Sequence, residues 1–283
     1  MTARIPPRLD RNARLLGVEA LERLGRAHVV VLGLGGVGSF AAEALSRAGV
    51  GRLTLVDGER IDETNVNRQL HALDGELGRM KADVLAERLR RIAPAARIEA
   101  VTAFYGEENA AALVPAAGVD LVVDAMDTVV AKLHVIDRCV ALKLAIVTAL
   151  GAARRLDPTA IQVTDLSESH TDPLAKDVRK YLRTRHGLSA TAPTGVLAVW
   201  SIEPPRASLA LPGDEEDGIP GARQRLPGER RREPKAYGSI AFVTAAFGLA
   251  AAGAAVQHLT GIRPETPRLL DEAEANRRRK QER

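Results

Sequence analysis

The stretch VVVLGLGGVG at residues 29–38 decides the fold of this chain. An apolar run of this kind indicates a buried parallel strand, and the glycines that end it indicate a tight turn into a helix. Such a turn lets backbone approach a phosphate closely, and the N-terminus of the following helix attracts the anion. The glycines concerned are Gly33, Gly35, Gly36 and Gly38. The stretch therefore predicts a nucleotide site, and it leaves the nucleotide and the reaction open.

A second apolar run, RLTLVD, ends in Asp57, 19 residues after Gly38. A carboxylate at this place accepts hydrogen bonds from a ribose in dinucleotide-binding folds. The combination of a glycine turn with one acidic residue is also found in dehydrogenases, so on its own it does not choose between NAD and ATP.

The composition limits the possible domain size, covalent cross-links and cellular location of the protein. At 283 residues and 46% hydrophobic content, the chain can bury the core of one large or two small domains. Its one cysteine, Cys139, excludes an internal disulfide and an all-cysteine metal cage. The N-terminal MTARIPPRLDRNARLLG has no apolar segment of signal-peptide type, so we expect a cytoplasmic protein.

Apolar runs alternate with helix-type patterns along the first half of the chain, which predicts βαβ units and a parallel sheet. The expected strands are His28–Leu32, Arg52–Asp57, Arg97–Ala103, Val119–Ala125 and Leu144–Leu150, and the expected helices are Val37–Ala48, Arg79–Ile92, Glu107–Val114 and Val129–Leu142. Ile161–Leu166 and Gly195–Ile202 extend the sheet. We predict an α/β fold: a Rossmann-like, doubly wound, mostly parallel sheet with an antiparallel extension in the C-terminal half.

The domain organisation follows from composition. Residues 1–27 are expected to form an arm with a short helix, residues 28–262 a single domain, and residues 263–283 a basic, disordered tail. The stretch at about 205–235, rich in Gly, Pro, Arg and Glu, predicts a long mobile loop. Residues 239–260 lack charge and are long enough to span a bilayer, yet Ala and Gly dominate, which favours a packed helix over a membrane span.

Polar and charged side chains follow the predicted strands at positions that suit a magnesium triphosphate. Asn65, Arg68 and Gln69 share one short loop, and Lys81 begins the next helix pattern. An arginine forks onto phosphate oxygens and a lysine adds a point charge, whereas an uncharged nicotinamide needs neither. Asp127 follows the fourth strand on the same edge, where a carboxylate beside a polyphosphate holds Mg²⁺. These parts suit attack of a carboxylate on the α-phosphate of ATP.

Three residues of this region have alternative interpretations. Asp127 could cap the next helix together with Thr128, and Asp124 could replace it as the metal ligand. His71 could contact the substrate, although a structural surface histidine is the simpler interpretation. Cys139, in the middle of a helix pattern, is interpreted as a small core residue.

The motifs GLGGVG, LVDGERIDETNVNRQLHAL, GRMKADV and DAMDT together resemble the adenylating domain of the ubiquitin-activating-enzyme-like (ThiF-like) family. The resemblance implies that residues 28–262 are an adenylating domain that uses ATP and Mg²⁺. It implies that Asp57 binds the ribose, Asn65 and Arg68 the phosphates, Lys81 the α-phosphate region and Asp127 the magnesium. Arg14 matches an arginine that the family contributes across a dimer interface, so a homodimer with a shared site is expected.

The second half resembles one branch of that family, the dehydratases that cyclise threonylcarbamoyladenosine in tRNA. The resemblance rests on TDPLAKDVRKYLR at 171–183, AVWSIEPP at 198–205 and YGSIAFVTAAFGL at 237–249. It implies that ATP activates the carboxylate of the threonylcarbamoyl group on a tRNA adenosine next to the anticodon. The group then cyclises with loss of water. The anticodon arm of tRNA is then the partner, and the basic residues at 176, 179, 180 and 183 and in 223–235 gain a use in binding phosphate.

Two rival functions stay open. An activating enzyme for a ubiquitin-like sulfur-carrier protein shares the adenylation half, although its two CxxC pairs are missing here. A dinucleotide-binding module without adenylation chemistry is opposed by Arg68, Lys81 and Asp127. Whether a cysteine desulfurase or another sulfur-acceptor system is a partner is also left open.

Overall fold

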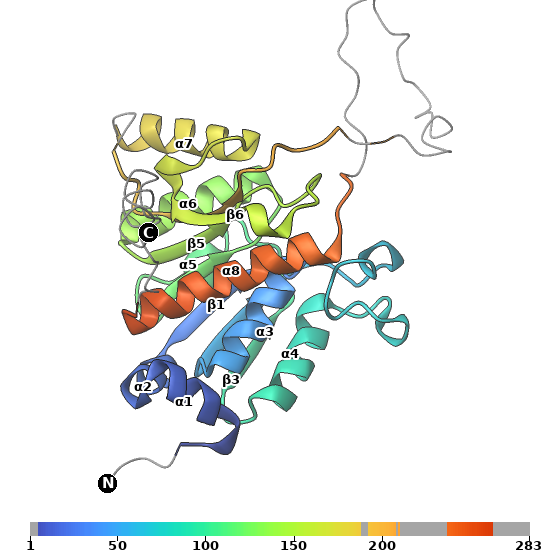
Figure 1. Cartoon of the computed structure of the whole chain (residues 1–283), viewed down its shortest axis with the longest axis vertical. Helices are drawn as coiled ribbons and strands as arrows, with labels where there is room; N and C mark the ends of the chain where they lie inside the picture. Colours follow the sequence, from blue (N-terminus) through green and yellow to red (C-terminus); the bar gives the residue numbers. More distant parts are fainter. Residues whose placement is uncertain (1–4, 188–191, 208, 210–236, 263–283) are drawn as a thin grey trace, which may run out of the picture.

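The apolar runs form a seven-stranded sheet in a computed structural model that describes residues 5–187, 192–207, 209 and 237–262 (Figure 1). The strands are β1 (His28–Leu32), β2 (Arg52–Val56), β3 (Arg97–Val101), β4 (Leu121–Asp124), β5 (Ala145–Ala149), β6 (Ile161–Asp165) and β7 (Leu197–Ser201). Their order across the sheet is β3-β2-β1-β4-β5-β7-β6. All neighbours are parallel except β6, which runs antiparallel to β7 at the edge. The predicted fold class is confirmed.

The strand order reverses between β1 and β4. The chain moves outward from β1 to β2 and β3, then returns to place β4 on the other side of β1. At such a switch point the connections leave in opposite directions and open a crevice outside the carboxyl ends of the strands, where ligands bind in open α/β sheets. The glycine turn follows β1, so it lies at this crevice.

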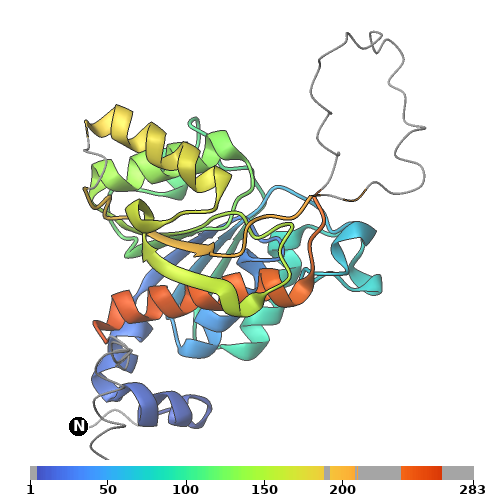
Figure 2. The same ribbon diagram turned by 45° about the horizontal axis from the view of Figure 1, so that its top comes forward.

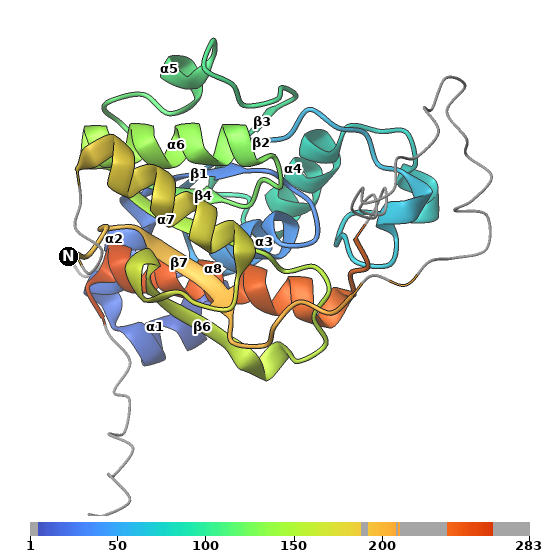
Figure 3. The ribbon, with the colours of Figure 1, turned by 90° about the horizontal axis from the view of Figure 1, so that it is seen from above.

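Helices cover both faces of the sheet. In the view of Figure 3, strands β1 and β4 run between α5 and α6 on one side and α3 and α8 on the other. The main helices are α3 (Gly38–Ala48), α4 (Lys81–Ile92), α5 (Ala110–Leu113), α6 (Val129–Leu142), α7 (Pro173–His186) and α8 (Ala241–Thr260). Two buried clusters correspond to the two faces, one built with α3, α4 and α8 and the other with α5, α6 and α7. All five residues of β1 are buried, as a central parallel strand requires.

Helix α8 packs beside α3 on the same face of the sheet. Val243, Phe247 and Ala251 are fully buried, and Gly248 lies so close to α3 that a Cβ there would be 2.3 Å from the carbonyl oxygen of Val37. Within the described residues, α8 is the one helix long and apolar enough to cross a membrane, with a mean hydropathy of 1.4. Its packing against the sheet and α3 agrees with the predicted packed helix.

The N-terminal helices lie at the amino ends of the strands, opposite the carboxyl ends that carry the glycine turn. Short η1 (Pro7–Leu9), α1 (Asp10–Leu16) and α2 (Val18–Arg26) lead into β1. Arg8 donates to the carbonyl of Ile92, the last residue of α4, and Asn12 donates to the carbonyl of Arg47 near the end of α3. In Figures 1 and 2 these helices lie away from the segment in cyan that follows β2.

Several boundaries differ from the prediction. Residues 10–16 are helical, although we expected an arm, and the third strand ends at Val101 rather than Ala103. The predicted helix 107–114 is reduced to Ala110–Leu113 because Asn109 closes a turn that precedes it, accepting from the backbone N–H of Gly106. Asp172 caps α7, accepting from the N–H of Ala175. The expected loop at 205–235 falls largely, and the expected tail entirely, outside the described residues.

The close approach of α8 to α3 predicts that Gly248→Ala destabilises the protein by about 1–3 kcal/mol, because the added methyl group meets backbone. Gly253→Ala in the same helix is the matched control, since its Cβ would meet no described atom within 4 Å; it gains up to about 1 kcal/mol in helix propensity. Urea unfolding monitored by circular dichroism measures both. Equal midpoints for the two variants would contradict the packing described here.

Candidate active site

Three of the four glycines in the turn are required by the chain's own packing. Gly33 has φ +81°, and a Cβ there would lie 2.8 Å from the carbonyl oxygen of Ala125, just after β4. A Cβ at Gly38 would lie 1.8 Å from the carbonyl oxygen of Gly33, and one at Gly36 would lie 2.9 Å from Oγ1 of Thr244 in α8. Because these three glycines have no side chain, the turn between β1 and α3 packs closely against the end of β4 and against α8.

Gly35 differs from the other three. A Cβ there would make only ordinary contact among the described residues, at 3.8 Å from Nε2 of Gln69. Its backbone is therefore accessible, and α3 begins three residues later without a side-chain cap. The N–H of Ser39 already donates to the carbonyl of Gly35, and the other N–H groups at the start of α3 suit an anion.

Asp57 supports the turn from β2. Its Oδ2 accepts from the N–H of Leu34 at 2.7 Å, and its Oδ1 accepts from the N–H of Glu59 at 2.8 Å. The residue is only 9% exposed, and burial raises the pKa of its carboxyl group. Each carboxylate oxygen has a second lone pair, so Asp57 can hold the turn and still accept from a ribose hydroxyl.

The loop after β2 carries the predicted phosphate-binding residues. Asn65 is buried and its Oδ1 accepts from the N–H of Asp62, which fixes the short helix η2 (Glu63–Asn65). Arg68 donates to the carbonyl of Thr64 at 2.8 Å, and its Cγ lies against Gly36. Gln69 is 7% exposed, and its Oε1 has no hydrogen-bond partner in the described part of the chain. A buried acceptor without a partner beside Gly35 is a place where a ligand donor fits.

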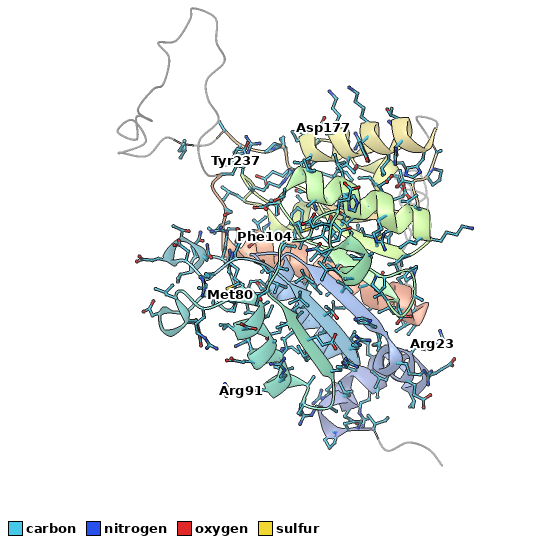
Figure 4. The ribbon with its side chains drawn as sticks, turned by 180° about the vertical axis from the view of Figure 1, so that it is seen from behind. Arg23, Met80, Arg91, Phe104, Asp177 and Tyr237 are labelled. Carbon is cyan, nitrogen blue, oxygen red and sulfur yellow. The ribbon has the colours of Figure 1, made fainter. Side chains whose placement is uncertain are left out.

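Lys81 begins α4 at the same edge of the sheet. Its side chain is 3% exposed and its Nζ pairs with the carboxylate of Glu59, whose side chain is 58% exposed. The backbone holds the two residues together, because the N–H of Lys81 donates to the carbonyl of Glu59 at 3.1 Å. In Figure 4, Met80, the preceding residue, lies on the same side of the molecule as Phe104 and at the opposite end of α4 from Arg91.

Asp124 belongs to a buried ion pair. Its Oδ2 accepts from Nζ of Lys132 at 2.6 Å and from Oγ1 of Thr148 at 2.6 Å, and its Oδ1 accepts from the N–H of Met126. Asp124 and Lys132 are both fully buried. This carboxylate is occupied, so the alternative that Asp124 replaces Asp127 as the metal ligand is not supported.

Asp127 is exposed in the loop between β4 and α6. The N-cap residue of α6 is Thr128 and it makes no side-chain capping bond, so the alternative role as a helix cap is also unsupported. Within the described residues, no group of three or more His, Cys, Asp or Glu side chains converges as a metal site. A metal at Asp127 would therefore need oxygen ligands from a bound polyphosphate and water.

The interpretation of His71 as a surface histidine is wrong. It is 2% exposed, and burial together with the charge of Lys81 lowers its pKa to about 4. The next residue, Ala72, packs with Ile61 and with Val84 of α4, which the local sequence LHAL does not reveal.

The structure thus brings the turn, Asp57, the 65–69 loop and Lys81 to one edge. Arg14 lies elsewhere: its side chain is 74% exposed in α1, where it pairs with Asp10 at 2.9 Å. Because α1 contacts the far end of α3, and η1 just before it contacts the far end of α4, Arg14 lies away from the site of its own chain.

Three residues near this edge were missed from the sequence. Glu59 and Lys132 carry the partner charges of Lys81 and Asp124, and Phe104, 68% exposed, covers Gly58 beside Asp57. A single lysine inside the apolar pattern 129–142 was a signal for a buried pair, since a lysine on a buried face needs a carboxylate. For Glu59 and Phe104 the sequence carried no comparable signal.

A family model confirms what this geometry indicates: the model of the ThiF family matches residues 9–282. The chain belongs to the ThiF family. Its relatives include the tRNA threonylcarbamoyladenosine dehydratase of Bacillus subtilis, 44% identical over 69% of this chain and 75% of that protein. The Escherichia coli enzyme of the same name is 39% identical over 89% of this chain and 93% of its own length.

Solved structures agree with the sequence comparison. The crystal structure of the E. coli dehydratase TcdA in complex with ATP has a TM-score of 0.75 and 38% identity, and the match covers 90% of this chain and 94% of that one. A molybdopterin-synthase adenylyltransferase of Haemophilus influenzae, from another branch of the ThiF family, is 30% identical over 62% of this chain and 69% of its own length.

The buried pair beside the site predicts that Lys132→Met destabilises the protein by about 3–5 kcal/mol, because it leaves the carboxylate of Asp124 charged and unpaired. Combining Lys132→Met with Asp124→Asn removes both charges and should recover most of that loss. Lys176→Met, at an exposed position of α7, is the control and should stay within about 0.5 kcal/mol of the wild type. Thermal or urea unfolding measures all three, and an additive double variant would refute the coupling.

Proposed function

We propose that this chain is an ATP-dependent dehydratase that cyclises threonylcarbamoyladenosine in tRNA through an acyl-adenylate. The observation that carries the proposal is the 39% identity with the E. coli dehydratase over 89% of this chain. The match to the molybdopterin enzyme is weaker and covers 62%. The alternative function, activation of a sulfur-carrier protein, is therefore the second candidate.

ATP fits the edge described above. The E. coli relative has been solved with ATP and with AMP, the substrate and the released nucleotide of an adenylation. In this chain the accessible backbone of Gly35 and the first turn of α3 face the phosphates, with Arg68 and Lys81 as the cations. Asp57 accepts from the ribose, and the free Oε1 of Gln69 accepts from a donor of the nucleotide or of the activated substrate. Asn65 fixes the loop that presents Arg68.

In the first step a carboxylate oxygen of the modified adenosine attacks the α-phosphorus and pyrophosphate leaves. In the second step an atom of the same substituent attacks the activated carbonyl and AMP leaves, so that the tRNA loses one water overall. The protein's contribution is charge stabilisation and positioning by Arg68 and Lys81. Asp127 would hold Mg²⁺, which would neutralise charge on the phosphates.

Such a reaction requires no enzymic thiol. Cys139 is fully buried, and burial raises the pKa of its thiol to about 12, so it is not a nucleophile at neutral pH. This supports a substrate that carries its own nucleophile, and nothing in the described residues supports a sulfur-transfer partner.

We further propose a homodimer in which Arg14 completes the site of the other subunit. The exposure of Arg14, and its distance from the site of its own chain, support this arrangement. Leu15 beside it is 83% exposed and Val18 is 46% exposed, an apolar surface next to the arginine.

The RNA-binding surface is proposed to include α7. Lys176 and Lys180 are exposed on it, whereas Arg179 donates to the carbonyl and Oγ of Ser169 and is less available to a phosphate. The arginines of 223–235 lie outside the described residues. With tRNA as substrate, we propose a cytoplasmic location.

The test is to incubate the protein with ATP, Mg²⁺ and tRNA from a strain lacking this activity, and to weigh the nucleosides after digestion. Threonylcarbamoyladenosine should lose one water, and omission of Mg²⁺ should prevent the loss. An unchanged nucleoside, together with pyrophosphate exchange that depends on a small carrier protein and not on tRNA, would establish the second candidate.

The shared site predicts that Arg14→Ala abolishes turnover while ATP binding, measured by calorimetry, stays within about threefold, because one exposed charge is removed from outside the nucleotide loops. Lys81→Ala should also be inactive. Mixed after subunit exchange, the two variants should regain about a quarter of the wild-type activity, because one of the two sites in each mixed dimer is intact. A mixture without activity would exclude the shared site.

A further inference from the structure

The residues just before α8 join two loops at the carboxyl edge of the sheet. Nδ2 of Asn67, in the nucleotide loop after β2, donates to the carbonyl of Ser239 at 3.0 Å. The N–H of Arg154, in the loop after β5, donates to the carbonyl of Gly238 at 2.8 Å. Tyr237, which directly precedes these two residues and is labelled in Figure 4, is therefore held where the two loops meet.

The loop after β5 lies on the opposite side of the nucleotide turn from the proposed ribose acceptor. Asp57 follows β2 on one side of β1, whereas Arg154 follows β5 on the other side, with β4 between. A nucleotide with its ribose at Asp57 and its phosphates at the turn after β1 leaves the edge beyond β4 to the second substrate. We therefore expect the group that is activated to approach past the loop after β5 and Tyr237.

Arg154 and Tyr237 form a stacked pair at this place. The guanidinium carbon of Arg154 lies 4.5 Å from the centroid of the Tyr237 ring, within the range of a cation–π contact. Arg154 has φ +63°, a left-handed conformation that a residue with a side chain adopts only where its surroundings hold it. Its backbone is held on both sides, by the bond to Gly238 and by the N–H of Arg206, which donates to its carbonyl at 2.8 Å. Tyr237 is 42% exposed.

The next residue anchors the same loop to the core. Arg155 is 3% exposed, its Nε donates to the carbonyl of Gly151 at 2.6 Å, and its Nη2 donates to Oδ2 of Asp172 at 3.0 Å. Asp172 is the N-cap of α7, the helix proposed to contact RNA. The stacked pair therefore sits on a rigid support that also fixes the start of α7.

A flat aromatic ring beside a guanidinium group matches the chemistry of unpaired RNA. Every base has a π-face that stacks on such a ring, and the neighbouring phosphates are attracted to the cation. The adenosine of the proposed reaction lies next to the anticodon, in a single-stranded loop whose bases are available for stacking.

We propose that Tyr237 and Arg154 form a stacking site for one unpaired base of the RNA substrate, beside the nucleotide site. The base stacks on the exposed surface of Tyr237, and Arg154 orients the ring and attracts an RNA phosphate. This rests on the proposed function, because the ligand is its RNA substrate.

The test uses an anticodon stem–loop RNA with 2-aminopurine placed in turn at each loop position, because stacking on an aromatic ring quenches the fluorescence of this base. Binding to the wild type should quench one position strongly. Tyr237→Leu should abolish that quenching and raise the Kd of the RNA about tenfold, whereas Tyr237→Phe, which keeps the ring, should stay within about threefold. The KM for ATP should stay within about twofold in both variants.

Phe242→Leu is the matched control, because it removes a 48% exposed aromatic ring of α8 that is not part of the stacked pair. It should match the wild type in quenching and in Kd. Quenching that survives Tyr237→Leu, or equal losses of affinity in Tyr237→Leu and Tyr237→Phe, overturns the proposal.

The salt dependence of binding separates stacking from phosphate contacts. A stacked base releases no counterions, so Tyr237→Leu should keep the wild-type slope of log Kd against log salt concentration. Arg154→Gly suits the left-handed backbone and removes the guanidinium, so it should reduce the slope by about 0.7. A reduced slope in Tyr237→Leu, or an unchanged slope in Arg154→Gly, contradicts the roles given to these two residues.

A further measurement needs only the wild type and the conservative variant. The chain has three tyrosines, so 3-fluorotyrosine labelling gives three ¹⁹F resonances, and Tyr237→Phe assigns the one of interest. The stem–loop RNA should shift this resonance, and a non-hydrolysable ATP analogue alone should not. A protein that binds no RNA and responds instead to a carrier protein overturns both proposals; one that dehydrates tRNA with an unmoved Tyr237 resonance overturns only this one.

Discussion

The close contact between the β1–α3 turn and the end of β4 is the constraint on which the rest of the site depends. Gly33 approaches the carbonyl of Ala125, and Gly38 approaches the carbonyl of Gly33, at distances that no side chain tolerates. Because the turn is this tight, α3 starts directly at the crevice between β1 and β4. Asp57 then reaches the N–H of Leu34 from β2, and the turn and its neighbouring strand become one rigid frame.

Much of this frame could be predicted because its signals are local. Buried parallel strands read as continuous apolar runs, and residues just beyond their carboxyl ends share one edge by topology. The departures have tertiary causes. The N-terminal segment is held by the bond of Arg8 in η1 to the end of α4 and by the bond of Asn12 in α1 to the end of α3, which no local pattern shows. His71 is buried, and the next residue, Ala72, packs with Ile61 and with Val84 of α4, a contact between distant parts of the chain.

The environments of the charged residues at the site also could not be predicted from local sequence. From the sequence, Asp127 is the predicted metal ligand, and Asp124, three residues earlier, is the alternative. Asp124 is the last residue of β4 and fully buried beside Thr148 of β5, where Lys132 neutralises it. Asp127 is past the strand and exposed. The two lysines differ in the same way, since Lys132 pairs inside the core, whereas the partner of Lys81 is largely exposed and can be exchanged for a ligand.

The contact of Gly36 with Thr244 links the nucleotide turn to a helix about two hundred residues later in the chain. Asn67 makes a similar link, donating to the carbonyl of Ser239. Domains generally fold as units during synthesis, from the N-terminus onward. In this chain every predicted nucleotide-binding residue is synthesised by residue 127, yet the turn has no α8 to pack against until residues 241–260 have left the ribosome. The nascent protein therefore carries all of these nucleotide-binding residues without their packing partner while residues 128–240 are synthesised.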